Sequence, residues 1–96
     1  MSGPFVVRTT PHYERLARDL AQKHAEFLTR QEEAGQILRT DPNNRSRQHN
    51  ILKLRGVPPA EGQYRLRLGR FRFRYDIYGR DVVLLACSLR REDTYR

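Results

Sequence analysis

Residues 63–78 alternate apolar and polar side chains with a period of two, and this pattern constrains the fold more than any other part of the chain. Aromatic and aliphatic residues occupy one set of positions, and arginine occupies most of the other set. Such alternation is typical of strands with one buried face. The dipeptide Gly69-Arg70 interrupts it once, and glycine in the first position of a two-residue loop is typical of a β-hairpin. The segment therefore predicts two antiparallel strands, 63–68 and 70–78.

The two-residue loop also predicts how the two strands pair. Apolar residues then lie opposite apolar residues, while Arg67 lies opposite Arg72 and Arg65 lies opposite Arg74. Like charges in directly opposed positions destabilise a sheet. Four arginines on one face therefore cost stability without a structural gain, which indicates that this face binds a polyanion. Asp76, expected on the same face, would dilute the charge.

The first half of the chain predicts a strand and two helices. Residues 4–9 form a short apolar strand, and Thr10 followed by Pro11 is typical of a helix start. Apolar residues then recur at helical spacing in two stretches. We expect a tight turn between them at 22–24 and a stop at Asp41-Pro42.

The second half predicts the rest of the sheet. Residues 41–62 are expected to be irregular, with a short extended piece at 51–54. Gly79-Arg80 predicts a second two-residue turn, and residues 81–89, which include the single cysteine, predict a further strand. We therefore expect one α+β domain over residues 1–96 with the order β-α-α-β-β-β. Its two helices would pack on one face of an antiparallel sheet.

The charge of the chain indicates its partner. Of 19 basic residues 17 are arginine, against 11 acidic residues, and the formal net charge is +8. The excess lies in residues 49–96, and because an arginine fork binds phosphate at two points, nucleic acid is the expected partner. No apolar stretch approaches the length of a membrane span, and the N-terminus does not resemble a secretory signal. We expect a cytoplasmic protein without a membrane partner.

Side chains beside the arginines complete a candidate site for RNA cleavage. Lys53 and Arg55 precede the first arginine strand, and Arg90, Arg91 and Tyr95 follow the last strand. Attack of a ribose 2′-hydroxyl on its own 3′-phosphate needs charge stabilisation, a base and an acid. Arginines supply the first, and nearby positive charge lowers the pKa of a tyrosine. The alternative for Tyr95 is an exposed aromatic without a role.

The histidines do not predict a metal site. His12, His24 and His49 have no ligand spacing to one another or to Cys87, so we expect neither metal nor cofactor. His49 lies beside the basic loop 45–47 and is a candidate acid or base near RNA. Together with it, three cations are expected to bind RNA without a catalytic role: Lys53, Arg55 and Arg74.

Several of these segments together resemble the RelE/ParE superfamily of bacterial toxins. In chain order they are Thr10-Pro11, Asp41-Pro42, Lys53 to Gly56, Tyr64 to Tyr75 and Arg90 to Arg96, and they cover nearly the whole chain. The resemblance implies the RelE-like fold of the microbial RNase-barrel type and a cognate antitoxin. We expect that antitoxin to be acidic, to cover the sheet and the helices, and to be the only route to operator DNA.

The superfamily has two functional branches. RelE-like members cleave mRNA on the ribosome without a metal, and the resemblance assigns their catalytic positions to Arg65, Arg67, Arg72, Arg90 or Arg91, and Tyr95. ParE-like members lack this set and inhibit DNA gyrase. Lysine is usual at positions 65 and 67, and because arginine is a poor general base, proton transfer would fall on Tyr95 or on the ribosome. We expect an endoribonuclease, with gyrase inhibition or operon repression together with the antitoxin as alternatives.

Overall fold

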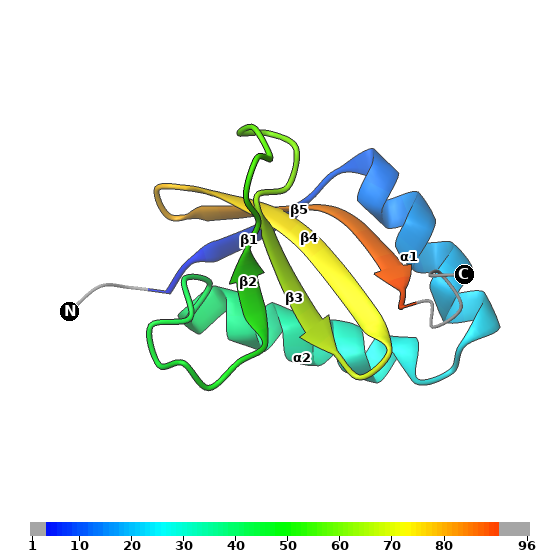
Figure 1. The fold of residues 1–96 in the computed structure, drawn as a ribbon. Coiled ribbons are helices and arrows are strands. Elements are labelled where there is room, and N and C mark those ends of the chain that lie inside the picture. Colours follow the sequence, from blue (N-terminus) through cyan, green and yellow to red (C-terminus); the bar gives the residue numbers. More distant parts are fainter. Residues whose placement is uncertain (1–3, 91–96) are drawn as a thin grey trace, which may run out of the picture.

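The computed structural model describes residues 4–90, which form two helices and a five-stranded sheet (Figure 1). In chain order the elements are β1 (Val6–Thr9), α1 (Pro11–Lys23), α2 (Phe27–Thr40), β2 (Ile51–Lys53), β3 (Tyr64–Leu68), β4 (Phe71–Tyr78) and β5 (Asp81–Leu89). The strands are arranged in the order β1-β5-β4-β3-β2. The predicted α+β class, with two helices packed against a sheet, is confirmed.

Two features of the sheet differ from the prediction. The extended piece near residue 51 is a true strand, because β2 pairs antiparallel with β3 and becomes one edge of the sheet. At the other edge β1 pairs parallel with β5, with Val6 opposite Asp81. The sheet is therefore mostly rather than wholly antiparallel. No local turn predicts that β1 pairs with β5 or that this pairing is parallel, because the two strands are far apart in the sequence.

Both predicted glycine turns are present. Gly69 has φ +59° and Gly79 has φ +60°, a left-handed backbone conformation that glycine adopts without a Cβ clash. β3 and β4 pair in the predicted register, which sets Arg67 opposite Arg72. The face that each side chain of this hairpin occupies is therefore the predicted one.

The helix boundaries agree with the sequence at the start of α1 and at the end of α2. Thr10 caps α1, since its Oγ1 accepts a hydrogen bond from the backbone N–H of Tyr13 at 3.1 Å. α1 continues through Lys23, so the turn predicted at 22–24 comes after His24 instead. Within residues 4–90 neither helix is long and apolar enough to cross a membrane.

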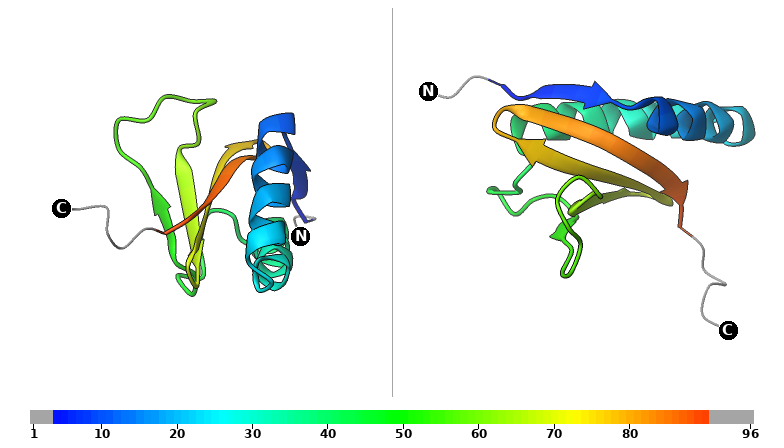
Figure 2. Two further views of the ribbon diagram at one scale, coloured as in Figure 1. Left: turned by 90° about the vertical axis from the view of Figure 1, so that its right-hand side faces the viewer. Right: turned by 90° about the horizontal axis from the view of Figure 1, so that it is seen from above.

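Both helices pack on the same face of the sheet, and the loop between β2 and β3 projects from the other side (Figure 2). One apolar cluster joins the helices to alternate residues of the strands, and its largest members are Tyr13, Phe27, Leu38, Leu66, Phe71, Phe73, Tyr75 and Val82. Leu28 of α2 lies outside this cluster and is 58% exposed. Cys87 is buried in this cluster, and burial raises the pKa of its thiol to about 12.

Candidate nucleic-acid interface

The sheet face opposite the helices carries four arginines, which we call the arginine face: Arg65 and Arg67 on β3, and Arg72 and Arg74 on β4. Their strand neighbours point into the core, so the pleat directs these four side chains to the other side. Figure 1 looks onto this face, with α2 behind the sheet. No helix of the described chain covers it.

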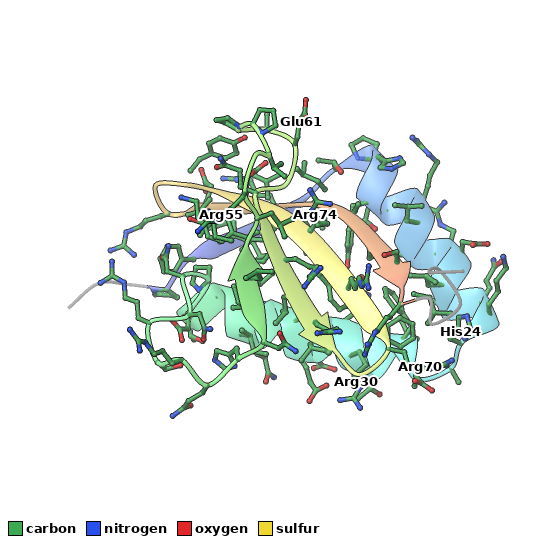
Figure 3. All side chains as sticks on the ribbon, viewed as in Figure 1. His24, Arg30, Arg55, Glu61, Arg70 and Arg74 are labelled. Carbon is green, nitrogen blue, oxygen red and sulfur yellow. The ribbon has the colours of Figure 1, made fainter. Side chains whose placement is uncertain are left out.

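Arg74 is held by the loop between β2 and β3. Its Nε donates to the carbonyl oxygen of Gly62 at 2.9 Å, and its Nη2 donates to Gly62 O at 2.7 Å and to Glu61 O at 3.1 Å. Figure 3 shows Arg74 at the base of the loop that carries Glu61. The guanidinium predicted to bind RNA therefore supports this loop.

Asp76 anchors the same loop from β4. The residue is 2% exposed, and its two carboxylate oxygens accept hydrogen bonds from the backbone N–H groups of Gly62 (3.0 Å) and Gln63 (2.8 Å). Gly62 has φ +82°, and a Cβ at this position would lie 3.2 Å from the Cβ of Arg74. Asp76 is thus buried under the loop. The expectation that it dilutes the exposed positive charge is wrong.

Arg67 and Arg72 are the arginines that the fold leaves available. They lie directly opposite each other, and within residues 4–90 neither guanidinium forms a hydrogen bond or an ion pair. The Nε of Arg72 is buried and has no acceptor in the described part of the chain. An unsatisfied buried donor and an opposed like-charge pair both lower stability. The pair is therefore maintained at a cost to the fold.

Two neutral residues, missed in the sequence, extend this pair across the sheet. Ser88 lies opposite Arg72 on β5 and is exposed. Asn50 continues the register of β2 opposite Arg67, whose backbone N–H donates to Asn50 O at 2.9 Å. We call Asn50, Arg67, Arg72 and Ser88 the outer row. Ser88 stands in a nearly continuous apolar run and Asn50 in an irregular segment, so only the pairing of the strands reveals them.

A second row crosses the sheet closer to the loop, and we call it the inner row. It consists of Leu52, Arg65, Arg74 and Ala86, one from each of the same four strands. Its ends are apolar and Arg74 is engaged by the loop. The two rows therefore differ in what they can offer to a polar ligand.

Three predicted RNA-binding residues lie apart from the outer row. Lys53 pairs with Tyr64 and so points to the helix side, where its Nζ lies 5.6 Å from the centre of the Tyr64 ring. Arg55 is exposed in the loop that follows β2 (Figure 3). His49 faces the end of α2, with its Nε2 3.7 Å from the carboxylate of Asp41.

The turn that holds His49 is organised by Asp41. Although burial raises the pKa of this carboxyl, hydrogen bonds from the Ser46 hydroxyl (2.6 Å) and from the backbone N–H groups of Arg45 and Ser46 lower it below its ordinary value. The side chain of Asn44 also bonds the backbone of His49 through both its oxygen and its nitrogen. These contacts give His49 a place in the turn rather than on the arginine face.

The C-terminal end of β5 lies beside the β3–β4 hairpin. The backbone N–H of Arg90 donates to Arg70 O. The side chain of Arg70 lies 3.3 Å from the Glu26 carboxylate and 3.5 Å from the Nδ1 of His24 (Figure 3). Arg90 therefore leaves the sheet next to the outer row. Arg91 and Tyr95 lie outside the described residues.

No family model, curated protein or solved structure matches this chain. In the part of the chain that the structure describes, no three His, Cys, Asp or Glu residues lie close enough together to hold a metal ion. A functional interpretation depends on the arrangement of the sheet face and on the sequence itself.

Proposed function

We propose that this protein is the toxin of a bacterial toxin–antitoxin pair and that it cleaves mRNA on the ribosome by attack of a ribose 2′-hydroxyl on its 3′-phosphate. The observation that carries the proposal is the opposed pair Arg67 and Arg72 on an uncovered sheet face. A phosphate between the two guanidiniums accepts hydrogen bonds from both and removes their repulsion. The cost of the pair in the free protein then becomes a gain in the complex.

In this proposal each group has one chemical task. Arg67 and Arg72 bind the scissile phosphate and stabilise the negative charge that develops on the phosphorane. Arg65 and one of Arg90 and Arg91 add positive charge around it. Because arginine keeps its proton, Tyr95 or a group of the ribosome takes the proton of the 2′-hydroxyl. The bond between phosphorus and the 5′-oxygen of the next nucleotide breaks, and this leaving oxygen takes up a proton.

An acidic antitoxin is the partner that this surface favours. An acidic segment neutralises the arginine face, and apolar residues of the same partner fit a groove of about 450 Å³ between α1 and β5. The groove is lined in part by Leu16, Leu20 and Leu89. β1 pairs with β5 only as far as Leu84, so the strand edge beside the groove has no strand partner within residues 4–90. The antitoxin, rather than this chain, would contact operator DNA.

Primer extension on cellular mRNA after brief induction of the protein tests the proposal. We expect new 5′ ends at fixed codon positions in translated messages, and their loss in Arg67→Gln. Arg39→Gln is the matched control, since it removes the same charge from the exposed surface of α2 and should leave cleavage intact. Intact mRNA together with breaks in DNA would contradict the proposal.

Inhibition of DNA gyrase is the second candidate, and one observation favours it. Among residues 4–90 the arginine face carries no exposed histidine or carboxylate, since His49 faces Asp41 and Asp76 is buried under the loop. A surface without a proton acceptor suits a toxin that binds its target without chemistry. The same experiment distinguishes the two candidates, because only gyrase inhibition predicts intact mRNA together with breaks in DNA.

A further inference from the structure

We infer that a single-stranded RNA crosses the sheet along the outer row and that Asn50 and Ser88 contact it at the two ends of this row. The class of ligand rests on the proposed function. The direction in which the RNA crosses the sheet and its contacts with Asn50 and Ser88 rest instead on the pairing of β2, β3, β4 and β5. They do not depend on the proposed function.

A path along the strands is short. At one end the β2–β3 loop covers the face, held there by Arg74 and by the buried carboxylate of Asp76. At the other end β3 turns into β4 at Gly69, so both strands end there. Between these two ends the uncovered length of β3 and β4 holds few residues on the arginine face. A polynucleotide lying along the strands would soon meet the loop or the turn.

A path across the strands is longer and polar throughout. Neighbouring strands lie about 4.8 Å apart, so the four residues of the outer row span about 14 Å. That width accommodates more than one nucleotide at the roughly 3.4 Å rise of stacked bases. Arg67 and Arg72 take the centre of this path, and Asn50 and Ser88 take its ends.

The neutral ends provide what the two arginines lack. A serine hydroxyl and an asparagine amide each donate and accept hydrogen bonds, whereas guanidinium only donates. They can therefore bond a sugar hydroxyl or a base edge as well as a phosphate oxygen. The inner row ends instead in Leu52 and Ala86, which offer neither.

Fluorescence anisotropy with a labelled ten-nucleotide RNA, measured over a series of salt concentrations, tests this inference. Ser88→Ala and Asn50→Ala should each weaken binding by about three- to tenfold, the worth of one hydrogen bond. The dependence of affinity on salt should not change, because no charge is removed. Arg67→Gln and Arg72→Gln should reduce that slope by about 0.7 each.

Two further variants separate a ligand contact from a structural role. Ser88→Thr keeps the hydroxyl and should bind RNA like the natural protein. Ser88→Ala combined with Ala86→Ser moves the hydroxyl to the inner row and should not restore binding. If Ser88→Ala and Asn50→Ala bind RNA normally while the arginine variants do not, the inference is wrong and the proposed function stands. If the arginine variants also bind normally with an unchanged salt slope, both are wrong.

Discussion

Replacing Arg72 with methionine should make the protein more stable and weaken its binding of RNA. Methionine keeps an unbranched apolar stem at this position but removes the charge opposite Arg67. It also removes an Nε that is buried and has no acceptor among residues 4–90. Both changes relieve a cost that the free protein carries.

The size of the effect follows from these two contributions. A buried donor without an acceptor costs about 1–3 kcal/mol, and an opposed pair of like charges costs about 0.2–1 kcal/mol. Packing lost with the guanidinium of Arg72 offsets part of this relief. We expect a net gain of about 1 kcal/mol in the free energy of unfolding, which raises the Tm of a domain of this size by about 4–8 °C.

Arg74→Met is the matched control, because Arg74 lies two residues away on the same strand and face. Its guanidinium donates to two backbone carbonyls of the loop, so the change should lower the free energy of unfolding by about 1–3 kcal/mol. Urea denaturation followed by circular dichroism measures both variants. Equal losses of stability would show that Arg72 supports the fold as Arg74 does. The reasoning that this arginine is maintained for a ligand would then be refuted.

Three other substitutions test separate parts of the structure. Gly62→Ala should lower the free energy of unfolding by about 1–2 kcal/mol, because the left-handed backbone disfavours a Cβ; unchanged stability would contradict the close approach to Arg74. Asp41→Asn should lower stability at pH 7. The folded protein holds the pKa of this carboxyl below its unfolded value, so its contribution is present above about pH 4 and is lost as the pH falls further. Urea titrations from pH 7 to 3 should therefore be flatter for Asp41→Asn, and parallel curves would argue against this role. Tyr95→Phe should slow single-turnover cleavage by about two to four orders of magnitude while ribosome binding stays the same; unchanged cleavage would assign proton transfer to the ribosome.

Local patterns were sufficient to predict the β3–β4 hairpin and its register. A period of two and a glycine turn are properties of neighbouring residues, and they determine which side of the sheet each residue occupies. The roles of the individual arginines were not predictable in this way. Arg72 and Arg74 occupy equivalent positions in the pattern, yet the donors of Arg74 are engaged by carbonyls of residues 61–62.

The other differences come from contacts between distant parts of the chain. Asp76 is buried because the loop folds back over it, and this depends on the conformation of Gly62. The roles of Asn50 and Ser88 depend on which strands lie side by side, because each becomes part of a polar row only through a neighbouring strand. The sequence therefore predicted which face of the sheet a residue occupies better than it predicted which groups the residue contacts.

The place of β5 between β1 and β4 has a consequence for synthesis of the protein. A chain is made from its N-terminus, so β1 and α1 emerge long before the strand against which both pack. Until residues 81–89 have been translated, β1 has no neighbouring strand and the row that ends in Ser88 is incomplete. Pairing between such distant segments also slows folding. For the proposed toxin, the candidate RNA-binding surface is therefore completed only after β5 has been made.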